Sequence, residues 1–600
     1  MNRGLWVFRE EMEAYCINDV FVLGKIMMGY HQAAFDKFGM SPWMNATAPS
    51  FVHEVYIVNL SMGLELDEIP QEERDSRVQE IARKEFWAVL KPNEYWFARR
   101  GLRGGRTEIK QVYRKVSDEE WNRGVRIRYQ DICSEYPFQQ VVHDFPVGLP
   151  TCFIYDQDFT PCTIHQNNQQ EPCTCLPESR SDRYLNTIIK SEQPTSQQFL
   201  LELQDTRYCG IVCATVVPPP NLWHPLLMYF DHKSGKCIAS NQRMERGYWP
   251  TPLFKRALEI GYRLETLHRY DRYHSKPSLW RDIMLDLFME KMINSKATPI
   301  GAQAQQLIDG YRDKFGDDLG DMVATSIANN TWGKHAARKQ TAKVMMNSAW
   351  GKHAQRPVMP KSVIFNASDD DMSIVKFFQD CTKEKYKFLD GFALGEDKIH
   401  YKYLENTCHI QPDLHGGYLP AALFVTSYGQ LQLWEQMNAI DQNPLNRRVL
   451  MCDTDSIVYI YDPEEYNIPQ GSLLGEWEVE DEDRMNGGIR EFVGMGPKTY
   501  GFKCDNGYTK VKAKGISISL ASSTLVNFPM MKTIVCEHLR GRIPRNVLVP
   551  QTNFVWSHSR GIRTYRMLKE LKFNFSDMKG NLNRQTGFIE PFGYSNINIS

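Results

Sequence analysis

Two aspartates separated by one residue interrupt an apolar stretch late in the chain, and they constrain the fold more than any other feature. Residues 449–452 are apolar, Asp453 and Asp455 follow, and residues 456–460 are mainly apolar and β-branched. This pattern predicts a β-hairpin with two carboxylates at its tip. Because close negative charges repel, a divalent cation such as Mg²⁺, which prefers hard oxygen ligands, would favour the arrangement. Aspartate and serine are also common turn residues, so a solvated turn is an equal alternative for this stretch alone.

Length and composition indicate a folded chain of several domains. A chain of 600 residues exceeds one hydrophobic core, and 42% hydrophobic residues exclude a disordered protein. The 71 basic and 72 acidic residues give a net charge of -1, so any nucleic-acid surface must arise from local charge segregation. The 14 cysteines do not predict a disulfide framework in so long a chain. Since no signal peptide or membrane-spanning run is recognisable, we expect a soluble intracellular protein.

A third carboxylate is expected at the end of another strand. Residues 125–131 alternate between apolar and polar side chains, which predicts a strand ending near Asp131. Pro137 prevents simple continuation as a central strand. If this strand neighbours the hairpin, Asp131 converges with Asp453 and Asp455.

A cationic helix is predicted over residues 336–352. At positions i, i+4 and i+8, one face carries Lys339, Lys343 and Asn347. A different, packing face carries Ala342, Met345 and Ala349. No Asp or Glu occurs between Asp321 and Asp369, which suits a polyanion ligand. A solvated amphipathic face explains the lysines but not the missing acids.

Two further basic segments are candidates for nucleic-acid contact. In residues 99–107 the glycines Gly104 and Gly105 would allow close approach to a phosphate, and Arg106 adds a forked donor. Residues 496–515 interleave lysines with aromatic residues, including Lys498, Tyr500 and Lys514. The alternatives are a flexible basic linker for the first segment and an exposed edge hairpin for the second.

Other segments give coarser expectations. Helices are predicted over residues 9–40 and 420–440, and residues 251–293 read as one or two strands followed by a helix through Trp280 to Met292. The last 80 residues are expected to form a helical cap. A zinc site is one interpretation, and a surface insertion the other, of Cys162, His165, Cys173 and Cys175.

The order of these signals resembles the family B DNA polymerases. Residues 131–137, 343–351 and 453–456 are similar to motifs A, B and C of that family. The Gly104-Gly105-Arg106 loop, Lys498-x-Tyr500 and the long segments between the motifs resemble the protein-primed branch found in viruses and Polinton-type elements. Glu135 stands where the family usually has leucine, and Trp350 replaces the usual tyrosine of motif B.

The resemblance also concerns the 3′→5′ exonuclease of the family. Tyr15 and Asp19 are similar to its third motif, Y-x3-D, but the carboxylates of the two earlier motifs are missing. We therefore expect a chain that lacks most of the exonuclease domain and does not proofread.

The implied fold is α+β, a right-hand polymerase with an antiparallel-sheet palm, helical fingers and thumb, and inserted subdomains. The expected segments, in order, are an exonuclease remnant (1–40), a linker and template-binding loop (41–115), a first palm segment (116–155), an insertion between motifs A and B (156–290), fingers (291–356), an insertion between motifs B and C (357–425), a second palm segment (426–520) and thumb (521–600).

The implied activity is DNA-directed DNA synthesis with two Mg²⁺ ions, for which Mn²⁺ can substitute. Asp131 and Asp455 would bridge the ions, with Asp453 beside them. Lys343 and Lys339 would meet the triphosphate, Asn347 and Trp350 would line the nucleotide pocket, and Tyr136 would exclude a 2′-hydroxyl. The expected DNA contacts are Gly104, Gly105, Arg106, Lys498, Tyr500 and Lys514.

The expected partners are a DNA template-primer, deoxynucleoside triphosphates and a terminal priming protein, in the nucleus or cytoplasm of a cell that carries a virus or mobile element. The alternative is a catalytically inactive, DNA-binding polymerase remnant. A nuclease would need acids that this sequence lacks.

Overall fold

The computed structural model describes most of the chain from residue 92 onward. The described ranges are 92–156, 187–231, 234–278, 280–295, 297–355, 361–366, 372–383, 385–393, 398–405, 417–480, 488–542, 546–557, 561–571 and 578–595, with the single residues Met28, His31, Gln32, Phe35, Ser41, Val55, Ala88 and Leu90.

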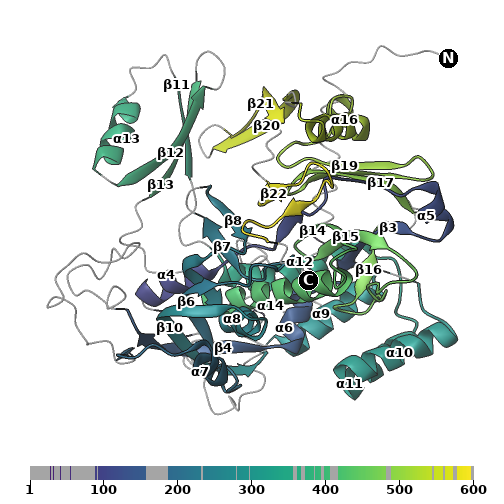
Figure 1. The fold of residues 1–600 in the computed structure, drawn as a ribbon, viewed down its shortest axis with the longest axis horizontal. Helices are drawn as coiled ribbons and strands as arrows, with labels where there is room; N and C mark the ends of the chain where they lie inside the picture. The colour runs from purple at the N-terminus through teal and green to yellow at the C-terminus, as the bar shows by residue number, and fades with distance from the viewer. Residues whose placement is uncertain are drawn as a thin grey trace.

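A nine-stranded antiparallel sheet lies at the centre of the molecule (Figure 1). Its main path runs β1-β14-β15-β3-β17-β18-β19, while β16 pairs with β3 and β2 pairs with β17. The strands are β1 (Thr107–Ile109), β2 (Tyr113–Lys115), β3 (Arg126–Ile132), β14 (Val449–Asp453), β15 (Ser456–Tyr461), β16 (Trp477–Val479), β17 (Ile489–Gly496), β18 (Thr499–Cys504) and β19 (Thr509–Lys512). Strands β1 and β2 come from the segment that the sequence assigned to a linker and loop.

Both faces of this sheet are covered, which explains why its strands read as nearly continuous apolar runs. Successive side chains of β15 alternate between two cores. Ile457 packs with α14 (Leu419–Ile440) on one face, and Val458 packs with α16 (Phe528–Leu539) on the other. The predicted helix over residues 420–440 is confirmed by α14.

A five-stranded sheet forms a second layer, with strand order β5-β4-β10-β6-β9. Helices α7 and α8 contact it, and a β7-β8 hairpin lies beside it. The elements are β4 (Asp144–Ile154), β5 (Thr187–Ile189), α7 (Ser196–Glu202), β6 (Tyr208–Val217), β7 (Met228–Asp231), β8 (Lys236–Ala239), β9 (Met244–Pro250), α8 (Thr251–Glu259) and β10 (Arg263–Pro277). The start of the 251–293 segment is therefore a helix, not a strand, because Leu253, Phe254 and Ala257 bury one helical face.

A group of helices packs on the other side of α14. It comprises α4 (Pro92–Gly101), α6 (Glu135–Val142), α9 (Arg281–Ile293), α10 (Ala302–Phe315), α11 (Asp317–Ala328) and α12 (Ala336–His353). The short α5 (Asp118–Asn122) precedes β3. The helices predicted through Trp280 to Met292 and over 336–352 are confirmed as α9 and α12, with buried Ala342, Met345 and Ala349 on the packing face of α12.

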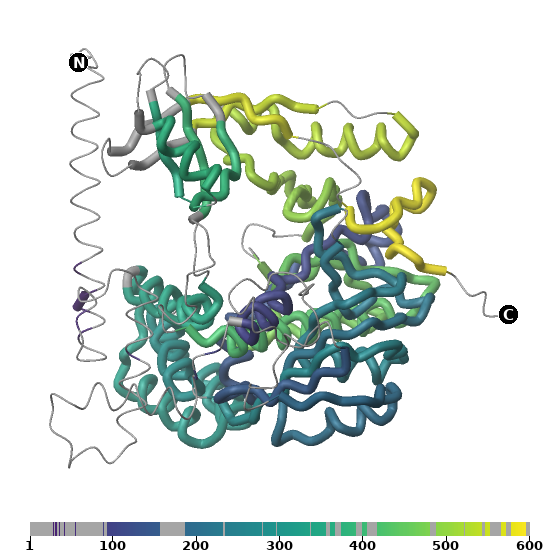
Figure 2. The backbone as a smooth tube through the Cα atoms, turned by 90° about the vertical axis from the view of Figure 1, so that its left-hand side faces the viewer, coloured from purple at the N-terminus to yellow at the C-terminus, as the bar shows by residue number. Residues whose placement is uncertain are grey.

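Two outlying units lie next to each other away from the central layers (Figures 1 and 2). One comprises β11 (Lys361–Asn366), α13 (Met372–Thr382), β12 (Tyr386–Ala393) and β13 (Lys398–Glu405). The other is the hairpin of β20 (Val547–Ser557) and β21 (Gly561–Leu571). The rest of the C-terminal segment contains α15 (Leu520–Ser523), α16, β22 (Asn581–Leu582) and β23 (Ile589–Glu590). The expected helical cap is wrong for most of this segment, since β20 and β21 form a long hairpin.

Several expectations fall outside the described residues. These are the exonuclease-like residues Tyr15 and Asp19, the candidate zinc ligands Cys162, His165, Cys173 and Cys175, and nearly all of the helix predicted over residues 9–40. Within the described ranges, no helix combines the length and apolarity that crossing a membrane requires.

Candidate active site

The acidic hairpin forms as the sequence predicts, with Asp453 ending β14 and Asp455 preceding β15. The backbone amide of Asp455 donates to the carbonyl oxygen of Asp453 at 2.9 Å. Thr454, between them, has φ of 67°, a left-handed conformation that costs free energy for a β-branched residue. The tight turn therefore presents two carboxylates at one end of the sheet.

Strand β3 brings Asp131 to the same place, across more than 300 positions of sequence. In the β15–β3 ladder Asp131 lies opposite Ser456, and the amide of Ile132 donates to the carbonyl oxygen of Asp455 at 2.8 Å. Asp131, Asp453 and Asp455 line the same pocket, and the charge of Asp455 acts on Asp131. The three predicted carboxylates therefore converge at this end of the sheet.

The electrostatics of this pair favour a shared positive charge. Burial, followed by the charges of Asp455 and Glu480, raises the pKa of Asp131 to about 8. Burial, with the nearby charge of Asp453, also raises the pKa of Asp455. In the absence of a cation the pair therefore holds a proton that an isolated aspartate would release at neutral pH. A dication bound there would replace that proton.

The donor set suits a magnesium-like ion whose shell is completed by substrate. In the described part of the chain, no three His, Cys, Asp or Glu side chains form a ready-made metal cluster. Magnesium in polymerase-type sites is commonly held by one or two carboxylates together with substrate phosphates and water, not by an all-protein cage. Asp131 and Asp455 supply two such carboxylates.

A pocket of about 270 Å³ opens at this point. It is lined by Tyr129, Asp131, Asp453, Thr454, Asp455, Ser456, Glu480, Lys498 and Lys512. The ammonium group of Lys498 lies 3.1 Å from the carboxylate of Asp453, and its side chain is 53% exposed. Glu480 and Lys512 are pocket residues that we did not include among the predicted site residues, whereas Lys514 is exposed and lies outside the lining.

An aromatic pair and an exposed polar helix face lie beside motif A. The rings of Tyr136 on α6 and Trp350 on α12 meet edge to face, with centroids 4.7 Å apart. Lys339, Lys343 and Asn347 are all exposed on α12. The structure therefore places Tyr136 of motif A against Trp350 of the motif B helix.

Sequence reasoning missed Lys291, in the last turn of α9. Its ammonium group donates to the hydroxyl of Ser134 at 2.7 Å. Burial, with smaller contributions from Lys343 and Lys339, lowers the pKa of Lys291. Three lysines from two helices therefore lie close enough to repel one another. The only sequence signal was one cation at the end of an apolar helix, which is common in helices for dipole reasons.

Two predicted DNA contacts are buried. Arg106 is 1% exposed, and its guanidinium donates to Glu108 and to the carbonyl of Pro225. The neighbouring Arg103 is partly exposed. Tyr500 is 0% exposed, and its hydroxyl lies 3.1 Å from that of Tyr129, so it supports the pocket from within the core. In this structure neither the guanidinium of Arg106 nor the ring of Tyr500 is on the surface, and their contact with DNA stays a prediction.

Glu135 is a buried acid without a hydrogen-bond partner. It is 3% exposed, and neither carboxylate oxygen is paired. Its side chain lies against Gly429 of α14, where an added Cβ would fall 2.6 Å from one carboxylate oxygen. Burial, and then the charges of Asp455 and Asp131, raise the pKa of Glu135 well above its ordinary value. Burial therefore favours the neutral form of this side chain in the folded protein.

Comparison with known proteins gives a family and a similar fold. Residues 1–308 match a family described as DNA polymerase type B, organellar and viral. The fold is similar to Phi29 DNA polymerase complexed with primer-template DNA, with a TM-score of 0.51, 16% identity, and coverage of 95% of this chain and 73% of that chain. A ternary complex of Phi29 DNA polymerase with primer-template DNA and incoming nucleotide substrates matches with a TM-score of 0.46, 15% identity, and coverage of 88% and 68%. No curated protein sequence matches the chain.

Proposed function

Because this chain belongs to the organellar and viral type B DNA polymerases, we propose that it extends a primer end, or the hydroxyl of a priming protein, with deoxynucleotides on a DNA template. The role would be replication of a viral or mobile element. The observation that carries this proposal is the convergence of Asp131, Asp453 and Asp455 in one open pocket.

In this proposal the nine-stranded sheet is the palm, helices α9 to α12 are the fingers, and the segment from residue 521 is the thumb. Asp131 and Asp455 would hold the divalent ions, with Mg²⁺ as the expected ion and Mn²⁺ as a substitute. When bound, such ions neutralise charge at the reacting phosphate and lower the pKa of the attacking hydroxyl. Phosphoryl transfer needs mainly positioning and charge neutralisation, so no covalent nucleophile is required.

The remaining side chains would bind and orient substrates. Lys339 and Lys343 present exposed ammonium groups on one helix face, and Lys291 on α9 adds a half-buried one that is hydrogen-bonded to Ser134. These charges would meet the triphosphate, since a polyanion removes the repulsion between the lysines. Lys498, exposed at the pocket rim, would contact the primer strand.

The base and sugar of the nucleotide would contact the aromatic side of the pocket. Trp350 and Asn347 would line the base and sugar site on α12. Tyr136, held edge to face against Trp350, would exclude a 2′-hydroxyl.

The decisive test is primer extension by Asp455→Ala. We expect loss of extension by a factor of about 10³ or more, because charge stabilisation of the transition state is usually the largest catalytic term, while template-primer binding persists. Glu464→Ala removes an exposed carboxylate three residues beyond β15 and serves as the matched control. Extension by Asp455→Ala at the wild-type rate would refute the assignment. If the wild-type protein binds DNA but extends no primer with either metal, the inactive-remnant alternative holds.

A further inference from the structure

The strained turn at Thr454 depends on contacts from outside its own hairpin. A β-branched residue at φ of 67° persists only where its surroundings over-determine the conformation. Within the hairpin, the amide of Asp455 and the hydroxyl of Ser456 donate to the carbonyl oxygen of Asp453. These bonds leave the backbone N–H of Thr454 without a partner in the hairpin, so its support comes from another segment.

That segment is the loop end at Gly105 and Arg106. A Cβ added at Gly105 would fall 2.4 Å from Cγ2 and 2.5 Å from Oγ1 of Thr454, so only glycine permits this approach. The carbonyl oxygen of Arg106 accepts the backbone N–H of Thr454 at 2.8 Å. The thiol of Cys452 also donates to that carbonyl, at 3.9 Å. Packing against Gly105 and a hydrogen bond to Arg106 thus hold Thr454, the residue between the two aspartates.

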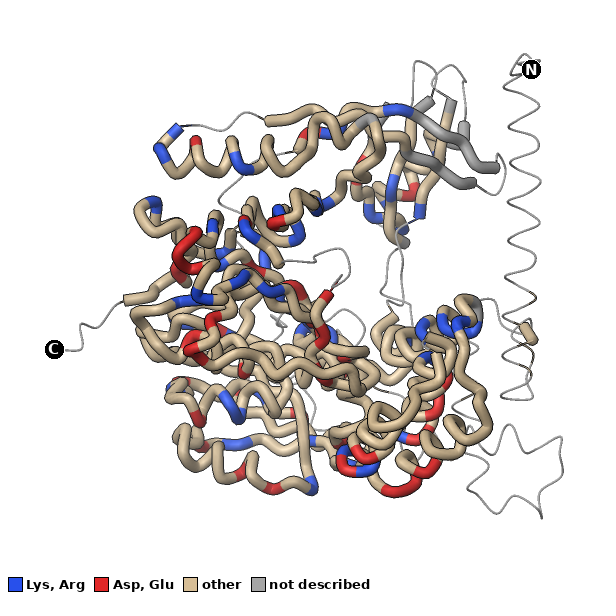
Figure 3. The backbone as a smooth tube through the Cα atoms, turned by 90° about the vertical axis from the view of Figure 1, so that its right-hand side faces the viewer, with Lys and Arg blue, Asp and Glu red and all other residues tan. Residues whose placement is uncertain are grey.

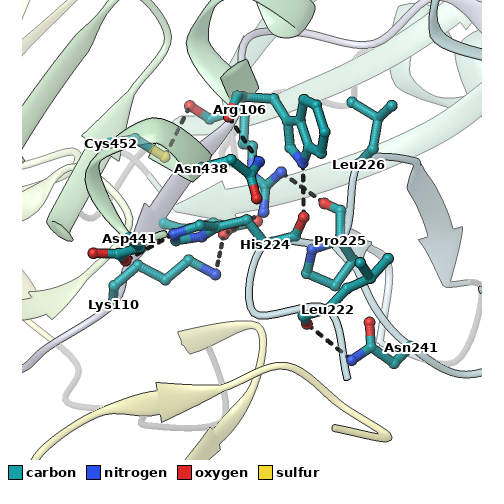
Figure 4. Close-up of polar contacts among 12 residues, drawn as sticks. Arg106, Lys110, Leu222, His224, Pro225, Leu226, Asn241, Asn438, Asp441 and Cys452 are labelled. Carbon is teal, nitrogen blue, oxygen red and sulfur yellow. Dashed lines mark hydrogen bonds and ion pairs between the residues drawn. The ribbon is translucent and has the colours of Figure 1, made fainter. Parts of the chain in front are cut away.

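Arg106 is itself locked in place from both sides (Figure 4). Its guanidinium donates to the carbonyl of Pro225 at 2.7 Å and to Glu108 at 3.0 Å. Lys110 lies 2.9 Å from the same Glu108 oxygen. Although burial alone would raise it, the neighbouring Arg106 and Lys110 lower the pKa of Glu108, which favours its carboxylate form in the core. The β1–β14 ladder, in which Thr107 faces Asp453, fixes the register of this unit against the turn.

We propose that Gly105 and Arg106 are positioning residues that clamp Thr454 and thereby hold Asp453 and Asp455 in a metal-competent arrangement. The inference rests on the proposed metal-dependent polymerase function. The role proposed for both residues acts through Thr454. The buried ion network of Arg106, Glu108 and Lys110 gives the clamp its rigidity, because removing any one partner would leave an uncompensated buried charge.

The test is Gly105→Ala, with Glu464→Ala, which truncates an exposed side chain outside the pocket, as the control. A methyl group at Gly105 collides with Thr454. We expect the Mg²⁺ concentration for half-maximal extension to rise about tenfold in Gly105→Ala, as for a loss of one order in affinity. The control is expected to match the wild type. The readout that needs no catalysis is hydrogen exchange of the Thr454 amide, expected to accelerate about tenfold in Gly105→Ala.

Rescue by a second substitution separates the clamp from general instability. Thr454→Gly removes the colliding side chain and allows positive φ at no cost, so Gly105→Ala/Thr454→Gly is expected to recover most of the Mg²⁺ response. The inference is overturned if folded Gly105→Ala keeps the wild-type Mg²⁺ dependence and Thr454 exchange, or if the double variant shows no recovery. If wild-type protein extends no primer, the proposed function fails, and exchange at Thr454 with Mn²⁺ binding to the free protein still decides the clamp.

Discussion

Unfavourable backbone conformations gather at the candidate active site. Among the described residues, three of the six non-glycine residues with positive φ are Ser134, Thr454 and Lys498. Ser134 accepts a hydrogen bond from Lys291, Thr454 separates two aspartates, and Lys498 pairs with Asp453. Such conformations cost roughly 1–3 kcal/mol each and persist where the surrounding structure holds them. The conformational free energy is therefore spent at residues whose neighbouring polar groups would contact substrate.

Glu135 adds a cost of a different kind at the same site. It lies four residues after Asp131, buried with both carboxylate oxygens unpaired. The folded state keeps a proton that the unfolded chain releases above the ordinary pKa of 4.5. The unfolded state therefore binds fewer protons in this range, so the stability contributed by this group falls as pH rises from 4.5 toward the raised pKa.

Glu135→Gln is predicted to remove this pH-dependent penalty. Near pH 4.5 the variant and the wild type should have the same free energy of unfolding. Above that pH the free energy of unfolding of the variant should exceed that of the wild type by up to about 1.4 kcal/mol more for each pH unit. Glu135→Leu, which leaves no unpaired polar group, should be at least as stable throughout. Scanning calorimetry of the three proteins from pH 4.5 to 8 measures the effect. A stability difference between variant and wild type that does not change with pH would contradict the protonation of Glu135 in the folded state.

At the scale of elements, the helices and strands that depend on a local residue pattern could be predicted from the sequence. Helix α12 and the β14–β15 hairpin follow from periodicity within a few residues. Lys498 and Tyr500 were both expected to contact DNA because lysines and aromatic residues are interleaved there, yet Lys498 lies in a turn before β18 and Tyr500 is buried in the core. The burial of Arg106 depends on Pro225, more than 100 residues away, so no local signal could reveal it.

Helices α9 and α12 together make a prediction about the nucleotide. Lys291→Ala is expected to raise KM for deoxynucleoside triphosphates about tenfold, since a hydrogen bond to a charged group contributes roughly 1.5–3 kcal/mol. Lys291→Arg should recover some of the loss. Lys190→Ala, at an exposed site on the five-stranded sheet, is the control. Steady-state extension kinetics decide the matter, and an unchanged KM in Lys291→Ala would exclude Lys291 from the triphosphate site.

At the scale of the whole molecule, the site depends on contacts between segments far apart in sequence. Basic and acidic positions are interspersed along most of the described chain (Figure 3), so the acid-free α12 region is a local exception in a nearly neutral protein. The segment around His224 ties the five-stranded layer to the central sheet (Figure 4). His224 lies 2.9 Å from Asp441, and its carbonyl accepts from the indole of Trp434 at 2.7 Å. Composition predicted several domains, but only the folded structure reveals this junction.

Asp441 lies at the centre of that junction, and substitution of Asp441 should destabilise the protein. It accepts hydrogen bonds from the buried ring of His224, whose pKa burial lowers to about 4, and from the amides of Arg448 and Val449 at 2.6 and 3.1 Å. Asp441→Ala leaves three buried donors unpaired, so we expect a loss of roughly 3 kcal/mol or more. Asp441→Asn keeps an acceptor for the two amides and should lose about 1 kcal/mol.

Denaturant unfolding, with hydrogen exchange at Val449, measures both variants. Because β14 begins at Val449 and ends at Asp453, faster exchange there in Asp441→Ala should accompany a weaker Mg²⁺ response in primer extension. Equal losses in the alanine and asparagine variants would mean that the link to His224, and not the start of β14, is what Asp441 supports. If Asp441→Ala is as stable as the wild type, Asp441 does not help to join the two sheets.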